Sequence, residues 1–200
     1  MSMDFQLLAA IAVFSFVTAI TPGPNNTILL STGVNHGFVK AIPFILGIQT
    51  GIVIVLSALS LGLSALLGEN PVVMQWLKYV GFAYILYLAW RIGMSRDVKD
   101  GQVDKPLGYL KAVALQFVNP KVWITMTAFT ASFIPANTDL LGYALIFGWV
   151  VLTKIPGASA WAAFGQILRE LLQKPRERKI FNALAALSLV GSMIPVVFFG

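Results

Sequence analysis

Long apolar stretches alternate with short polar connections along most of this chain. Six stretches come close to or exceed the roughly 20 residues that cross the hydrocarbon core of a bilayer. They lie at roughly 5–32, 40–67, 72–92, 109–134, 140–166 and 180–199. The pattern predicts an all-α integral membrane protein with six transmembrane helices, folded as a single domain over residues 1–200.

The connections between these stretches divide the chain into two halves. Tight turns are expected at 68–71 and 135–139, a longer polar loop at 94–108 and a densely charged connection at 169–179. The loop 94–108 separates halves of about 1–93 and 109–200, each with three predicted spans. An odd number of spans per half inserts the halves in opposite orientations, which predicts a 3+3 inverted repeat.

Composition agrees with a membrane location. Hydrophobic residues make up 58% of the chain, charged residues only 11%, and the mean hydropathy is +0.81. Soluble domains contain roughly 25% charged residues. Because the chain has no cysteine, it can form no disulfide, thiol redox centre or cysteine-based metal site.

The net charge of +6 is interpreted loop by loop, because membrane proteins keep Lys and Arg on the cytoplasmic side. Basic residues fall in or beside the first, third and fifth connections, and the second and fourth have none. This asymmetry places the basic connections in the cytoplasm and both termini outside. The alternative is a first segment that does not fully cross, which would leave the N-terminus inside.

Two of the predicted spans are interrupted by proline. The first break is Thr21-Pro22-Gly23-Pro24-Asn25-Asn26, and the second includes Gln116, Asn119, Pro120 and Lys121. Proline has no amide hydrogen, so the carbonyls four residues earlier lose their helical donors. Irregular backbone at membrane depth usually lines a path or a site.

The chemistry at these breaks suits a zwitterionic amino acid. Freed carbonyls can bind its ammonium group, and the first amides of a resumed helix can bind its carboxylate. Lys121 supplies a further positive charge. The predicted substrate-binding residues are Thr21, Pro22, Gly23, Pro24, Asn25, Asn26, Gln116, Asn119, Pro120, Lys121 and Lys154. The alternative is structural: the prolines kink the helices and the asparagines cap the kinks.

Two further polar residues lie within apolar stretches. Lys154 falls near the middle of the fifth span, where a charge is costly and often functional. Its structural alternative is a bond to the carbonyl of Leu152, which Pro156 leaves free. Gln49 lies within Gly47-Ile48-Gln49-Thr50-Gly51, a small-residue spacing interpreted as close helix packing, although its amide is polar enough to face a pathway.

Acidic residues are confined to loops and span ends, so no buried carboxylate is expected to relay protons. With one histidine, no cysteine and no buried acid, the chain offers no catalytic residues, metal ligands or cofactor site, and it is not expected to be an enzyme. A passive channel for small polar solutes or a structural membrane protein remains an alternative to a transporter.

The motifs resemble one known family. The run Thr21 to Asn25, Gly33, His36-Gly37-Phe38, Tyr87-Leu88-Ala89-Trp90 and Leu115 to Lys121 are similar to the lysine-exporter (LysE/RhtB) family of bacterial amino-acid exporters. The resemblance implies a gradient-driven secondary transporter that exports amino acids or close derivatives across the bacterial inner membrane. Its expected partners are that small-molecule substrate and the lipid bilayer, without nucleic acid, and a homo-oligomer stays open. Lys154 departs from the neutral polar residue that such relatives tend to have there.

Overall fold

The computed structural model describes residues 4–63, 71–94, 105–135, 137–192 and 194, which form helices and no strand. The elements are α1 (Phe5–Ile20), α2 (Pro24–His36), α3 (Phe38–Ala58), a π-helical segment η1 (Leu59–Leu63), α5 (Pro71–Gly93), α6 (Tyr109–Val118), α7 (Pro120–Phe133), α8 (Leu140–Leu171) and α9 (Pro175–Gly191). The predicted all-α class is confirmed.

Within the described residues, two helices are long and apolar enough to cross a membrane, Phe38–Gly62 and Leu140–Leu171. A third candidate is the pair α1 and α2, which is bent by 61° at its break. The other predicted spans correspond to α5, to α6 with α7, and to α9. The arrangement of six spans therefore stays a prediction.

The breaks in the helices lie where the prolines predict them. Pro24 and Pro120 each occupy the first turn of a new helix, where the missing amide hydrogen costs nothing. Gly37 joins α2 to α3 with a φ of 85°, a left-handed conformation that favours glycine. Asp4 and Asp139 cap α1 and α8 by accepting hydrogen bonds from the amides of Gln6 and Gly142.

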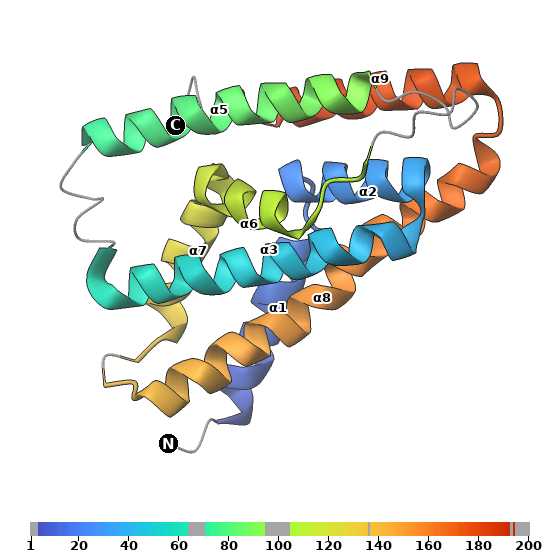
Figure 1. The fold of residues 1–200 in the computed structure, drawn as a ribbon. Helices are drawn as coiled ribbons and strands as arrows, with labels where there is room; N and C mark the ends of the chain where they lie inside the picture. The colour runs from blue at the N-terminus through green and yellow to red at the C-terminus, as the bar shows by residue number, and fades with distance from the viewer. Residues whose placement is uncertain (1–3, 64–70, 95–104, 136, 193, 195–200) are drawn as a thin grey trace.

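Helix α8 runs diagonally through the molecule and packs against α1, α2 and α3 (Figure 1). The crossing of α2 and α8 depends on glycine. A Cβ on Gly33 would overlap the carbonyl oxygen of Ala162, and a Cβ on Gly165 would overlap that of Leu30. The two backbones therefore approach as closely as small residues allow, as is common between membrane helices.

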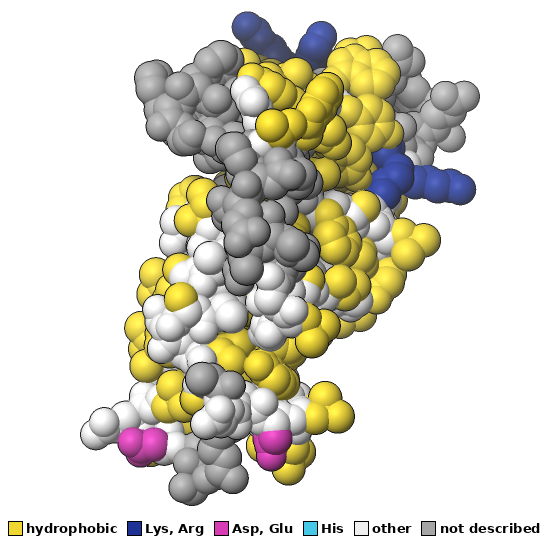
Figure 2. Space-filling view, turned by 90° about the vertical axis from the view of Figure 1, so that its left-hand side faces the viewer, with side chains coloured by type: hydrophobic (Ala, Val, Ile, Leu, Met, Phe, Trp, Pro, Cys, Tyr) yellow, Lys and Arg dark blue, Asp and Glu magenta, His cyan; other side chains and the backbone are white. Residues whose placement is uncertain are grey.

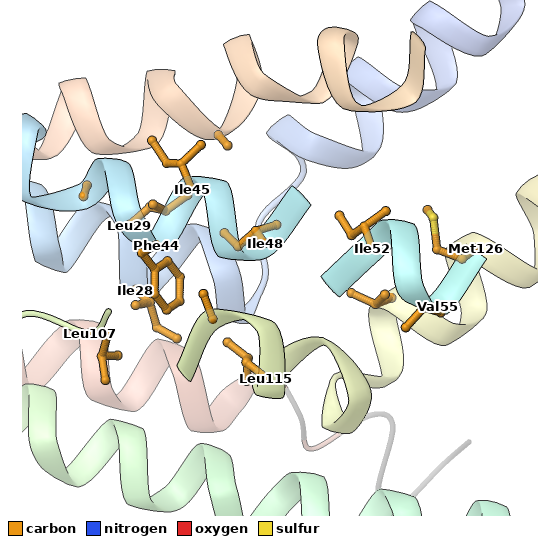
Figure 3. Packing of buried hydrophobic residues seen from close by; sticks show 14 of the residues in the cluster. Ile28, Leu29, Phe44, Ile45, Ile48, Ile52, Val55, Leu107, Leu115 and Met126 are labelled. Carbon is orange, nitrogen blue, oxygen red and sulfur yellow. The ribbon is translucent and has the colours of Figure 1, made fainter. Parts of the chain in front are cut away.

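Helix α3 packs against α6 by the same means. A Cβ on Gly47 would overlap the carbonyl oxygen of Tyr109, and one on Gly51 would lie 2.5 Å from Cγ of Gln116. Figure 3 shows the apolar cluster beside this contact, where Phe44 of α3 lies near Ile28 of α2. The predicted packing role of the two glycines is confirmed.

The remaining long helices, α5 and α9, lie side by side (Figure 1).

The pairing of α3 with α6 has a counterpart in the pairing of α8 with α1. In each case the second predicted span of one half packs on the first helix of the other half. The match does not extend to the next pair, because α2 packs extensively on α8 whereas α7 packs only slightly on α3.

Two acidic residues, Asp4 and Asp139, lie where α1 and α8 begin, whereas Glu170 and Glu177 lie beside basic residues. Figure 2 shows acidic side chains at the lower end, where α1 and α8 begin, and basic side chains in the upper part, with hydrophobic surface between them. The first, third and fifth connections, which carry the basic residues, lie close to one another. One hollow is lined by His36, Arg91 and Lys105, and another by His36, Arg169 and Arg178.

Some sequence predictions lie outside the described residues. These are most of the turn at 68–71 and of the loop 94–108, position 136 in the turn at 135–139, and the end of the last span at 195–199. The acidic residues Glu69, Asp97, Asp100 and Asp104 belong to the same group.

Candidate functional site

The two helix breaks, nearly 100 residues apart in the sequence, border one cavity. Its volume of about 50 Å³ exceeds the roughly 10–15 Å³ that one water molecule requires. It is lined by Thr18, Ala19, Gly23, Pro24, Asn25, Asn26, Ile48, Gln49, Ile52, Asn119, Lys121, Val122, Thr125, Met126, Lys154 and Ala158. The cavity is therefore bounded by α1, α2, α3, α7 and α8.

The carbonyls of the first break already accept hydrogen bonds from the protein. The Thr21 carbonyl accepts from Nδ2 of Asn26 at 2.7 Å and from Nζ of Lys121 at 2.6 Å. The Ile20 carbonyl, which Pro24 deprives of its helical donor, accepts from Nε1 of Trp161 at 3.2 Å. The prolines are expected to free the carbonyls of Thr18, Ile20 and Gln116 for a substrate ammonium. For Ile20 this expectation is wrong, because Trp161 supplies a donor, and the Gln116 carbonyl accepts from the amide of Asn119 at 3.4 Å.

Asn26 acts as the structural alternative predicts. Its side-chain amide donates to the carbonyl of Ala19 at 2.8 Å as well as to that of Thr21. Asn26 is buried and belongs to the first turn of α2, so it links the end of α1 to the beginning of α2. It fixes the angle between the two helices and also contributes to the cavity wall.

Lys121 connects the second break to the first. Its ammonium group donates to the carbonyls of Thr21 at 2.6 Å and Pro22 at 3.2 Å. Its hydrocarbon chain passes over Gly23, where a Cβ would lie 3.0 Å from Cδ of the lysine. A larger residue at Gly23 would therefore push the lysine away from its carbonyl partners.

The second break is capped by its own asparagine. Oδ1 of Asn119 accepts from the backbone amide of Lys121 at 3.2 Å, which is a typical N-cap at the start of α7. The start of α2 has no side-chain cap, because Gly23 occupies that position. The first amides of α2 therefore present the partial positive charge of a helix N-terminus at the cavity.

Asn25 and Gln116 form a reciprocal pair of amides. Asn25 donates to Oε1 of Gln116 at 2.8 Å, and Gln116 donates back to Oδ1 of Asn25 at 3.2 Å. Gln116 also donates to the Ala112 carbonyl at 2.7 Å and is completely buried. Asn25 lines the cavity whereas Gln116 lies behind it, so Gln116 orients Asn25.

Lys154 reaches across from α8 to α1. Its side chain is only 4% exposed, and its ammonium donates to Oγ1 of Thr18 at 2.6 Å. The Thr18 hydroxyl in turn donates a hydrogen bond to the Ser15 carbonyl at 3.0 Å. The structural alternative, a hydrogen bond from Lys154 to the Leu152 carbonyl, is not found among the described residues. An ammonium has three donors, so two of those on Lys154 have no partner among the described residues.

The electrostatic character of the cavity is positive. Lys121 and Lys154 both contribute to its wall, and the helices α2 and α7 both begin there. No carboxylate side chain belongs to the lining formed by the described residues. A ligand with a carboxylate would complete this charge distribution.

The structure divides the predicted site residues into two groups. Seven line the cavity: Gly23, Pro24, Asn25, Asn26, Asn119, Lys121 and Lys154. Four do not: Thr21, Pro22, Gln116 and Pro120. The lining also contains Thr18, Thr125 and Gln49, which are not among the predicted site residues; for Gln49, packing is the interpretation that the sequence favours. For Gln49, the available signal was an uncharged amide within an apolar helix.

Comparison with known proteins identifies the family. The family model for LysE type translocators matches residues 16–195. Cysteine/O-acetylserine efflux proteins of Escherichia coli (strain K12) and Shigella sonnei (strain Ss046) are each 32% identical to this chain over 200 residues, which covers 98% of this chain and 100% of theirs. No solved structure matches the chain. The match across nearly the whole length shows that the chain belongs to the LysE type translocator family.

Proposed function

We propose that this chain exports a small amino acid or a close derivative across the bacterial inner membrane, with the cavity between the helix breaks as its substrate site. The observation that carries the proposal is the meeting of two lysine ammonium groups and two helix N-termini at one buried cavity. The related proteins named for cysteine and O-acetylserine efflux suggest a small substrate that is zwitterionic.

The substrate carboxylate has several donors available. Lys154 has two N–H groups without a described partner, and Lys121 has one, because it donates to two carbonyls. The uncapped amides at the start of α2 add to this positive field. A carboxylate bound here would offset the repulsion between the two lysines, which makes the occupied site more favourable than the empty one.

A 3+3 inverted repeat of six spans, with halves of about 1–93 and 109–200, accounts for the position of the site. The reciprocal packing of α3 on α6 and of α8 on α1 supports this arrangement. Each half then contributes one broken helix to the cavity. Each also contributes one further helix with a polar side chain there, α3 with Gln49 from the first half and α8 with Lys154 from the second. Transport sites between repeats typically lie at such breaks near the bilayer midplane.

The orientation of the protein follows from its charges. The neighbouring hollows that contain His36, Arg91, Lys105, Arg169 and Arg178 bring the first, third and fifth connections together at one side. Asp4 and Asp139 cap the helices that begin elsewhere, in the lower part of Figure 1. The positive-inside rule then places the basic side in the cytoplasm and favours full crossing of the bent first span.

Export by bacterial cells fed with dipeptides tests the function. Expression of the chain is expected to lower the accumulated level of cysteine, serine or another small amino acid, and an uncoupler is expected to abolish this effect. A Lys111→Met variant, whose exposed lysine lies on α6 away from the cavity, serves as a matched control. A flux that persists with the uncoupler would indicate a channel, and unchanged amino-acid levels would contradict export.

A further inference from the structure

The side chain of Gln49 is buried in the cavity wall without any hydrogen-bond partner. It is only 4% exposed, and both its Oε1 and its Nε2 lack partners in the described structure. Among the described residues, the other buried side-chain atoms without partners belong to Ser15 and Ser60, and neither residue lines the cavity. An unsatisfied buried amide destabilises a fold, so its position calls for a ligand or water.

Packing prevents Gln49 from turning away from the cavity. Gly47 and Gly51 press α3 against α6 so closely that neither could carry a Cβ without overlap. This contact fixes the rotation of α3 about its own axis. Ile48 and Ile52 line the cavity on either side of Gln49, so the amide is held among apolar neighbours that offer it no partner.

Several polar groups around the cavity are already paired or can only donate hydrogen bonds. The carbonyls of Ile20 and Thr21 receive donors from Trp161, Asn26 and Lys121. The two lysines and the helix N-termini are donors only, and the described lining has no carboxylate. Among the buried side-chain atoms that line the cavity, Oε1 of Gln49 is the acceptor left without a donor.

We infer that Gln49 binds the α-ammonium group of the substrate through Oε1, while the lysines hold the carboxylate. This rests on the proposed function and adds the second half of zwitterion recognition. A neutral acceptor suits the position, because a carboxylate here would neutralise the charge that Lys121 and Lys154 offer to the substrate. The site would then reject an acid that has the carboxylate but no ammonium group.

The test compares an amino acid with the same molecule lacking its ammonium group. Purified full-length protein in liposomes is assayed for counterflow of cysteine and of 3-mercaptopropionate under reducing conditions, with protein-free liposomes to subtract leakage. The cysteine-free chain cannot react with either thiol. Wild type is expected to prefer cysteine, and Gln49→Leu is expected to lower cysteine flux and the preference ratio by about 10-fold or more.

Three comparisons separate a binding role from a structural one. Gln49→Leu is expected to melt at the wild-type temperature or higher, because it removes an unpaired buried amide. Gln49→Glu retains an acceptor, so it is expected to keep the preference for cysteine over 3-mercaptopropionate, although its charge is expected to lower the flux of both compounds by competing for the lysines. This variant also tests the idea if the leucine variant does not fold. Gln75→Leu makes the same chemical change at an exposed position on α5 and is expected to behave as wild type.

The outcomes are distinguishable. If wild type carries neither compound, the proposed function fails, and this inference fails with it. If wild type prefers cysteine and Gln49→Leu keeps the same ratio within about twofold, water alone satisfies the amide and only this inference is overturned. Loss of the preference in Gln49→Leu, with retention in Gln49→Glu and Gln75→Leu, supports it.

Discussion

The two helix breaks satisfy their backbone groups in different ways. At the second break, Asn119 caps α7 from two residues away. At the first break, Lys121 and Trp161 provide donors from 99 to 141 residues away. A displacement of α7 or α8 relative to α1 would therefore break bonds at the first site and leave the local cap intact. The backbone carbonyls of the first break therefore depend in part on helix packing for their donors, whereas the Asn119 cap of α7 does not.

The largest effect is expected from Lys121→Met, which removes the link between the breaks. Two charge-assisted hydrogen bonds are lost, at about 1.5 kcal/mol or more each, so export should fall roughly 100-fold. Export from dipeptide-fed cells measures this, with Lys111→Met as the control and membrane fractionation to verify insertion. Normal export would remove Lys121 from the site.

Lys154→Met should reduce export by roughly 30-fold, because the substrate carboxylate loses a charged donor worth about 2 kcal/mol. The variant should insert and melt at or above the wild-type temperature, since a buried charge has been removed. Lys40→Met changes an exposed lysine and provides the control. A large fall in melting temperature would instead show that the Lys154–Thr18 contact is structural.

Asn26→Ala should affect stability more than any local cap. The Ala19 carbonyl loses its side-chain donor and the Thr21 carbonyl keeps only Lys121, so we expect destabilisation of about 2 kcal/mol. Thermal unfolding in detergent, followed by tryptophan fluorescence, measures the change. Asn137→Ala, at an exposed turn, should be neutral.

Asn119→Ala should have the smallest effect, a loss of about 1 kcal/mol that is typical of an N-cap. The same unfolding assay measures this loss of stability, so that it can be compared directly with that of Asn26→Ala. If Asn119→Ala is the more destabilising of the two, the first break does not depend more strongly on its side-chain donors than the second break does.

The sequence was sufficient to locate the breaks but not their partners. Pro22, Pro24 and Pro120 interrupt their helices through the local geometry of proline, which can be predicted from the sequence alone. The donor that a freed carbonyl receives depends on helix packing. Trp161 reaches Ile20 only because α8 crosses α1 in one particular register, so the Ile20 carbonyl, expected to be open, is occupied.

The same limit explains the errors at the site. Gln116 was predicted to bind substrate, but it pairs with Asn25 behind the cavity wall. Gln49 was predicted to pack, although it faces the cavity, because the small residues on either side of it suggested a helix interface. The glycines do form that interface, and the side chain between them points elsewhere. Helical spacing alone does not determine which neighbour each face meets.

Protection of an introduced thiol by substrate tests directly whether the cavity between the two helix breaks is the substrate site. Because the chain has no cysteine, Thr125→Cys places a single thiol in the cavity wall, and Thr138→Cys places one in the connection before α8. The rate of mixed-disulfide formation with a small methanethiosulfonate reagent, which releases methanesulfinate, is measured with and without O-acetylserine. The account predicts slower labelling of Thr125→Cys and unchanged labelling of Thr138→Cys. Equal slowing at both positions, or none at Thr125→Cys, would contradict a substrate site between the two breaks.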